Sequence, residues 1–127
     1  MEGSTIITLA IAAIAVLLLY RTFAPVRGLK ELGDRAFREQ LQAAPRKLLI
    51  DVREPSEFRN GHIKGATNIP LSQLSSHLNK LPKDKEIFLN CQSGMRSKRA
   101  AAILLKHGFK QVSHLKGGIL AWTGERE

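Results

Sequence analysis

The chain reads EIFLNCQSGMRS from Glu86 to Ser97. The apolar run from Ile87 to Leu89 predicts a short buried strand, and a small polar loop then leads into a helical segment. A loop that joins a strand to a helix points successive backbone N–H groups at one place, where an anion is stabilised. The single cysteine of the chain, Cys91, stands at the start of that loop.

Cys91 therefore lies where a protein can stabilise a thiolate. Thiols at helix N-termini or beside cations lose their proton at lower pH than free cysteine does, so we expect Cys91 to ionise near neutral pH. Free cysteines are also commonly small buried apolar residues. The polar neighbours Asn90, Gln92 and Ser93 and the flexible Gly94 make that interpretation less suitable here. The hypothesis requires space for a second sulfur above the thiolate.

Apolar runs alternate with helical segments in the rest of the chain. Strands are expected at residues 48–52, 66–69, 86–89 and 112–115, and helices at 34–44, 55–59, 71–81 and 97–107. Asp34 is a candidate N-cap for the first of these helices. This alternation is typical of an α/β fold with a parallel sheet covered by helices on both faces, whose sites lie at the carboxyl ends of the strands. Asp51 and Arg53 occupy one such end.

Composition narrows the classes of function. The net charge is +9, but basic residues are mixed with acidic ones and the only tyrosine, Tyr20, precedes the predicted domain, so nucleic-acid binding is disfavoured. One cysteine excludes an intramolecular disulfide and fits a reducing compartment. The four histidines show no metal-ligand spacing, and we expect neither a metal nor a cofactor.

The N-terminal segment predicts a membrane anchor. Residues 5–20 carry no charge, and residues 3–24 together would span about 30 Å as a helix that ends at Pro25. We expect a transmembrane helix at residues 1–24, a basic linker at 25–33 and a globular domain at 34–127. Arg21, Arg27 and Lys30 follow the span, which places the N-terminus outside and the domain in the cytoplasm. A soluble amphipathic or buried helix and a cleaved signal are the alternatives.

The spacing from Cys91 to Arg96 separates two cysteine chemistries. Phosphatases need a wide loop, commonly Cys-x5-Arg, with an arginine for the phosphoryl oxygens and an acid for the leaving group. The loop here is Cys-x4-Arg, one residue shorter. A tighter loop suits a single sulfur atom attached to the cysteine, and attack on a sulfane sulfur requires no protonated oxygen leaving group. The spacing therefore favours sulfur transfer.

Five groups of residues resemble the rhodanese homology domain and follow that family's order. They are DVR at 51–53, EF at 57–58, GHIKGATNIP at 61–70, the loop CQSGMRS at 91–97 and GGILAW at 117–122. The resemblance covers about residues 30 to 124 and extends to single-domain rhodaneses with an N-terminal membrane helix. It implies a parallel sheet of about five strands covered by helices on both faces.

The resemblance also implies an activity. Cys91 would take a sulfane sulfur from a donor such as thiosulfate or a persulfide and pass it to a thiol acceptor, or to cyanide in the test tube. The substrate-binding loop would be Gln92, Ser93, Gly94, Met95, Arg96 and Ser97, and the structural residues near it Asp51, Arg53, Glu57 and His62. A non-catalytic membrane-tethered docking module is the main alternative, followed by a small-anion phosphatase or arsenate reductase.

Overall fold

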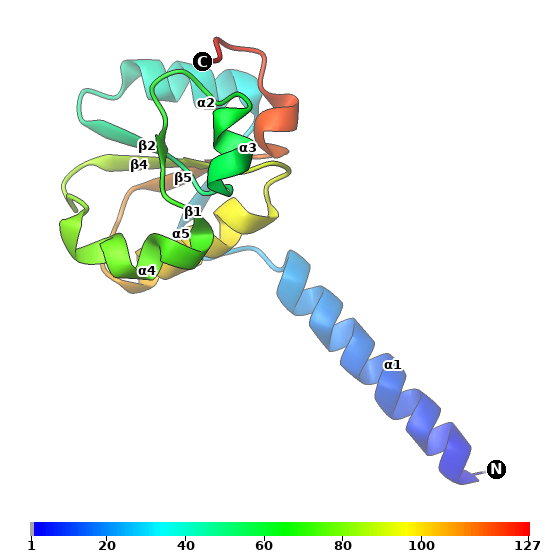
Figure 1. The fold of residues 1–127 in the computed structure, drawn as a ribbon. Helices are drawn as coiled ribbons and strands as arrows, with labels where there is room; N and C mark the ends of the chain where they lie inside the picture. The colour runs from blue at the N-terminus through cyan, green and yellow to red at the C-terminus, as the bar shows by residue number, and fades with distance from the viewer. Residues whose placement is uncertain (1) are drawn as a thin grey trace.

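The structure is a computed structural model that describes residues 2–127. One long helix precedes a domain in which short strands and helices alternate (Figure 1). The helices are α1 (Glu2–Phe23), α2 (Asp34–Ala43), α3 (Pro55–Arg59), α4 (Leu71–His77) and α5 (Met95–Lys106), with 3-10 turns η1 (Leu78–Lys80) and η2 (Gly118–Ala121). The strands are β1 (Leu29–Leu32), β2 (Lys47–Asp51), β3 (Thr67–Asn68), β4 (Glu86–Asn90) and β5 (Val112–Leu115).

Within residues 2–127, the five strands form one parallel sheet in the order β1-β5-β4-β2-β3. Asp51 of β2 pairs with Asn90 of β4, so the end of β2 lies beside Cys91 as expected. The predicted fold class, a parallel sheet of five strands covered by helices on both faces, is confirmed. Parallel strands are buried on both faces, which explains why the centre of β4, Ile87 to Leu89, is apolar at every position.

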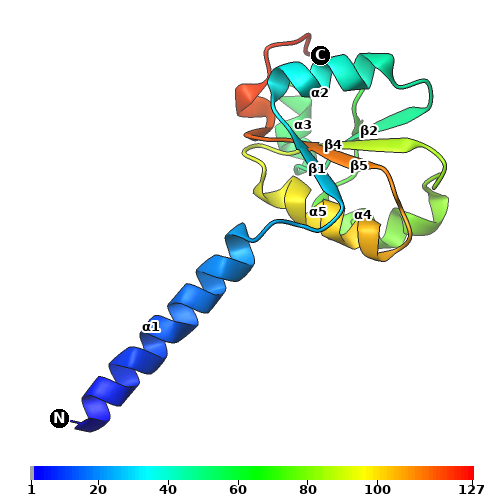
Figure 2. The ribbon, with the colours of Figure 1, turned by 180° about the vertical axis from the view of Figure 1, so that it is seen from behind.

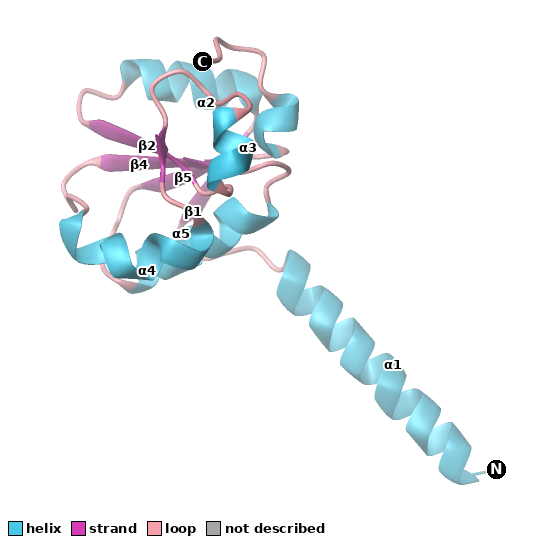
Figure 3. Cartoon of the chain, in the orientation of Figure 1, coloured by secondary structure: helices cyan, strands magenta, loops and turns pink. Residues whose placement is uncertain are grey.

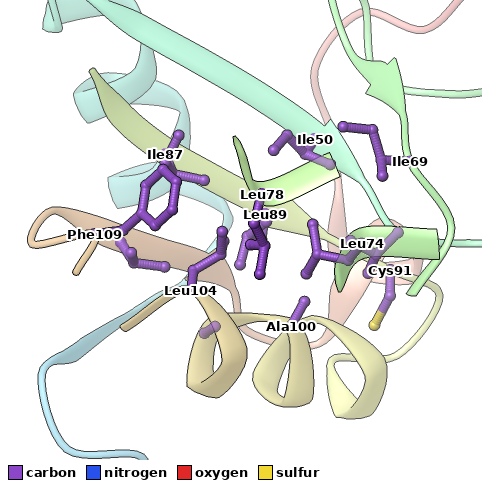
Figure 4. Packing of buried hydrophobic residues seen from close by; sticks show 13 residues of the cluster. Ile50, Ile69, Leu74, Leu78, Ile87, Leu89, Cys91, Ala100, Leu104 and Phe109 are labelled. Carbon is purple, nitrogen blue, oxygen red and sulfur yellow. The ribbon is translucent and has the colours of Figure 1, made fainter. Parts of the chain in front are cut away.

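Helices cover the two faces of the sheet and form two apolar clusters. The cluster under α4 and α5 includes Leu74, Leu89 and Leu104 and ends at Cys91 (Figure 4). The cluster under α2 and η2 is built on Phe88, whose ring meets Phe37 edge to face with centroids 5.5 Å apart. Figure 2 shows the same two layers from behind.

Three sequence-based boundaries differ from the structure. The stretch predicted as a linker, residues 25–33, contains β1, because the apolar ends of Leu29–Leu32 pack on the sheet and its backbone pairs with β5. Gly33, not Asp34, is the N-cap of α2; Asp34 is the first residue of the helix and accepts hydrogen bonds from Thr123. Helix α5 begins at Met95, before the predicted Ser97.

Helix α1 projects away from the domain in both views, with its C-terminal end near α5, and Figure 3 shows a loop leading from it to β1. Its apolar side chains are exposed, from Ile6 at 67% to Phe23 at 66%. By length and composition the helix is able to cross a membrane. The helices of the domain differ from α1, because their leucines pack against the sheet instead of facing solvent.

Replacing Phe88 by alanine should strongly destabilise the domain. The side chain is fully buried and its ring contacts Phe37, so truncation leaves a cavity and should lower the free energy of unfolding by about 3–5 kcal/mol. Denaturant unfolding of the full chain in detergent measures the change. Leu120→Ala is the control, because Leu120 is 70% exposed and its loss should change the unfolding free energy by less than about 0.5 kcal/mol. Equal unfolding midpoints for the two variants would contradict the packing described.

Candidate functional site

Cys91 follows β4 directly and its sulfur lies beside the first turn of α5 (Figure 4). The backbone N–H of Gly94 donates a hydrogen bond to Sγ at 3.0 Å. The thiol in turn lies 3.5 Å from the hydroxyl oxygen of Ser97, to which it donates. The expected loop between strand and helix is therefore present, and at least one of its amides points at the sulfur.

The thiol is more enclosed than the sequence hypothesis requires. Cys91 is 1% exposed, so the space expected above the sulfur for a second sulfur atom is not open in this conformation. The loop covers it with Gln92 half-buried, Gly94 and Ser97 buried, and Ser93 and Met95 exposed. In the conformation described, the loop separates Sγ from solvent.

The backbone of the loop is shaped by two glycines. Gly94 has a φ of 110° and is the N-cap of α5, a conformation in which other residues are strained. Gly118 packs directly on the loop, because a Cβ at that position would lie 2.3 Å from the carbonyl oxygen of Gln92. The N–H of Ile119 donates to the carbonyl of Cys91 at 2.8 Å. Residues 118–119 therefore pack against the cysteine loop and fix the position of its backbone.

Arg96 is paired with Glu57. Its Nη1 and Nη2 donate to Oε1 and Oε2 of Glu57 at 2.7 and 2.9 Å, a bidentate ion pair. Glu57 is positioned by the start of α3, where its carboxylate also accepts the N–H of Glu54. The hydrogen bonds from Arg96 lower the pKa of Glu57 from 4.5 to about 2. The guanidinium expected to hold substrate is thus engaged by a carboxylate, which raises the pKa of Arg96.

Asp51 and Arg53 form a second ion pair, which is buried. The Nη2 of Arg53 lies 2.8 Å from Oδ2 of Asp51, and the side chains are 5% and 0% exposed. Arg53 also donates to the carbonyl of Gly61 at 2.8 Å and to the side-chain oxygen of Gln92 at 3.4 Å. The pair expected to be structural therefore links the end of β2 to the cysteine loop, which satisfies the buried charges.

His62, the fourth predicted structural residue, lies away from the sulfur. Its ring stacks on Phe58 with centroids 3.7 Å apart, and its Nδ1 bonds the carbonyl oxygen of Phe58 at 2.9 Å. Its Nε2 is 3.4 Å from a carboxylate oxygen of Glu127. These contacts connect α3 to the C-terminal segment and do not bring the imidazole to Cys91.

Sequence reasoning missed two residues of the site. His114 in β5 accepts or donates a hydrogen bond through Nδ1 to the hydroxyl of Ser97 at 2.8 Å, and its Nε2 is 3.2 Å from Glu31 of β1. The available signal was an imidazole within the short predicted strand Val112–Leu115. Glu31 gave no signal, because its segment was predicted as a linker.

Two cavities flank the loop. One, of about 410 Å³, lies between the end of α1 and the start of α5, and the other, of about 380 Å³, opens beside Gln92 and Glu57. The first is lined by Arg21, Lys98 and Arg99 as well as by Met95 and Arg96 of the loop. Lys98 also donates to the carbonyl oxygen of Phe23 at 3.3 Å, a contact with the C-terminal end of α1. Among residues 2–127, no group of three or more His, Cys, Asp or Glu side chains is placed to hold a metal ion.

Comparison with known proteins finds one matching family and several relatives. The Rhodanese-like domain family matches residues 34–125. A "Sulfurtransferase" of Allochromatium vinosum is 33% identical over 93 residues, 73% of this chain and 87% of that protein. "Uncharacterized protein YqhL" of Bacillus subtilis is 42% identical over 123 residues, 97% of this chain and 95% of that protein.

Solved structures give the same result. The crystal structure of a rhodanese-related protein from Thermoplasma volcanium superimposes with a TM-score of 0.66 and 31% identity, covering 73% of this chain and 89% of that one. The match over residues 34–125, the shared parallel sheet and the sulfurtransferase relative lead to one conclusion. The chain belongs to the rhodanese-like domain family.

Proposed function

We propose that the chain is a sulfurtransferase that carries a sulfane sulfur as a persulfide on Cys91. The observation that supports this most is the 3.0 Å hydrogen bond from the N–H of Gly94 to Sγ, because an amide dipole aimed at sulfur favours the thiolate and the persulfide anion. The relatives named sulfurtransferase support the same class of reaction.

The proposed reaction has two steps. The Cys91 thiolate attacks the outer sulfur of thiosulfate, a new S–S bond forms, and the bond to sulfite breaks with sulfite taking the electron pair. An acceptor thiolate, or cyanide, then attacks the terminal sulfur of the persulfide, and Cys91 leaves as the thiolate. Neither step needs an acid for an oxygen leaving group. Residues 92–97 would surround the transferred sulfur, with Gly94 and Ser97 in contact with Sγ.

The burial of Cys91 favours one rival, a docking module in which the thiol has no chemical role. At 1% exposure, Sγ is not accessible in the conformation described. The proposal therefore requires the loop at residues 92–96 to open for the donor and again for the acceptor. The half-exposed Arg96–Glu57 pair at its end is the contact that would break or shift when it opens.

Thiosulfate treatment should add one sulfur atom to Cys91, and Cys91→Ser should abolish both this addition and thiosulfate:cyanide sulfur transfer. Because Cys91 is the only cysteine, intact-protein mass spectrometry reads the addition without ambiguity. Ser113→Ala is a control, since Ser113 is a buried small residue on the neighbouring strand and should leave loading intact. An unmodified wild-type mass after treatment with thiosulfate and with a low-molecular-weight persulfide would favour the docking module.

The Glu57–Arg96 pair should stabilise the fold in a pH-dependent manner. The folded-state pKa of Glu57, about 2, is below its usual 4.5, so the stabilisation is complete above pH 4.5 and disappears as the pH falls toward 2. Glu57→Gln should lower the free energy of unfolding by about 1 kcal/mol at pH 7, allowing for partial exposure, with the difference vanishing near pH 2. Denaturant titrations at several pH values measure it. Glu39→Gln, which removes an exposed pair with Arg35, should change little at any pH.

We also propose that α1 anchors the protein, with residues 1–24 in the bilayer, residues 34–127 as the cytoplasmic domain, and the N-terminus outside. The similarity to the Bacillus subtilis relative covers 97% of the chain and so includes most of α1. The exposed apolar helix and the basic residues that follow it support this orientation.

Alkaline carbonate extraction tests the anchor. The wild-type protein should stay in the membrane pellet, and Ile14→Arg should shift protein to the wash, because a charge near the middle of a span costs about 2.5–3.5 kcal/mol. Leu120→Arg places the same charge on an exposed side chain of the domain and should stay in the pellet. Release of the wild-type protein into the wash would exclude a spanning helix.

A further inference from the structure

His114 is a buried imidazole that the two-step reaction leaves unused. It is 2% exposed and lies in β5, in register with Glu31 of β1 on one side and Leu89 of β4 on the other. Its ring faces α5, where Ser97 begins the buried side of the helix. An ionisable ring in such a position needs hydrogen-bond partners, and it has one on each nitrogen.

The direction of these hydrogen bonds follows from the chemistry of the partners. A carboxylate only accepts, so the Nε2 that lies 3.2 Å from Glu31 carries the proton. In neutral imidazole Nδ1 then has a free lone pair and accepts the hydroxyl proton of Ser97 at 2.8 Å, a shorter contact than the 3.2 Å from the same hydroxyl to the carbonyl oxygen of Gly94. The Ser97 oxygen is left to accept from the Cys91 thiol at 3.5 Å. The four side chains form one chain of donors and acceptors that runs from the sulfur to Glu31.

The charges around His114 set its proton affinity. Burial lowers the pKa of His114, and the neighbouring Glu31 carboxylate opposes that effect. Lys98 on α5 is a cation that lowers it further. Directly after β4, Cys91 contacts Ser97, which in turn contacts the ring of His114. A thiolate at that position adds a second negative charge and favours the imidazolium.

We propose that Ser97, His114 and Glu31 form a relay that receives the thiol proton of Cys91, an inference that rests on the proposed use of Cys91 as a nucleophile. The S–H bond breaks as its proton passes to Oγ of Ser97, and the hydroxyl proton of Ser97 passes to Nδ1 of His114. The products are a thiolate, an intact serine hydroxyl and an imidazolium beside Glu31. No atom is gained or lost.

The relay gives each residue a distinct part. Ser97 touches the reacting sulfur and, after the transfer, donates its hydroxyl to the thiolate alongside the N–H of Gly94. His114 and Glu31 are positioning residues that act through Ser97. The thiolate therefore forms inside a closed loop, where Cys91 is 1% exposed and no bulk water needs to take the proton.

The pH dependence of Cys91 alkylation by iodoacetamide tests the relay in the full chain in detergent. The amide oxygen of His114→Asn is still able to accept a hydrogen bond from Ser97, but it is not a base that takes up the proton. Glu31→Gln keeps the hydrogen bond to Nε2 and removes the negative charge. Both should move the midpoint of the alkylation profile upward, His114→Asn by about one pH unit or more and Glu31→Gln by less. Glu31 is 42% exposed, so Glu31→Gln remains informative if the buried His114→Asn variant fails to fold.

His107→Asn is the matched control, because His107 is exposed at the C-terminal end of α5 and should leave the midpoint unchanged. A purely structural role for His114 would lower stability or the alkylation rate at every pH without moving the midpoint. Unchanged midpoints in both Glu31→Gln and His114→Asn would overturn the relay.

A reciprocal measurement uses the imidazole. If the thiolate and the imidazolium stabilise each other, Cys91→Ser should lower the pH at which His114 loses its charge, and by the same amount that His114→Asn raises the Cys91 midpoint. Nitrogen-15 NMR of the ring in wild type and Cys91→Ser reads this directly, and identical titrations would overturn the relay. Neither measurement uses a sulfur donor. Shifted midpoints without sulfur loading would support the relay and refute sulfur transfer, and loading without shifts would do the reverse.

Discussion

The close approach of Gly118 to the cysteine loop is the constraint on which the site depends. A side chain at residue 118 would overlap the backbone of Gln92 and Ser93, so only glycine allows this contact. The position of η2 is in turn fixed by Trp122, which is buried against Phe37 with ring centroids 6.1 Å apart. The shape of a loop on the α5 side of the sheet is therefore determined partly by packing on the α2 side. A change in the packing of this cluster should therefore also change the shape of the cysteine loop.

Charge around the sulfur is balanced in pairs. Arg53 is matched by Asp51, Arg96 by Glu57, and the imidazole of His114 faces Glu31. A guanidinium already bonded to a carboxylate offers less field to a neighbouring thiolate than a free one does. The N–H of Gly94, one of the loop amides that the sequence led us to expect near the sulfur, points directly at Sγ instead.

The sequence was most informative for elements whose structure depends on a local pattern of residues. Strands β2 and β4 follow from short apolar runs, and the turn at α3 follows from Pro55 with Asn60-Gly61 after it. Strand β1 has only Leu29 and Leu32 as apolar residues and gains its stability from pairing at the sheet edge, which no local pattern reveals. The start of α5 at Met95 depends on the left-handed Gly94 before it.

Contacts within the site depended on tertiary structure. The position of Cys91 was predicted because strand, loop and helix are consecutive. The Glu57–Arg96 pair joins residues 39 positions apart, and the His114–Glu31 pair joins residues 83 apart. The order of the strands in the sheet decides which distant residues come into contact. Strand β5 is the last strand in the sequence, but it lies between β1 and β4 in the sheet. The burial of Cys91 likewise depends on how η2 folds back over the loop.

The cavity between α1 and α5 brings Arg21 of the helix next to Met95 and Arg96 of the cysteine loop. If α1 crosses a bilayer, the loop faces the lipid headgroups rather than the interior of the cell. Encounters with a carrier that is itself confined to that surface then take place in two dimensions, where tethering keeps both reactants at high local concentration. A freely diffusing small molecule gains nothing from such an arrangement, so a spanning α1 would favour acceptors that travel along the membrane.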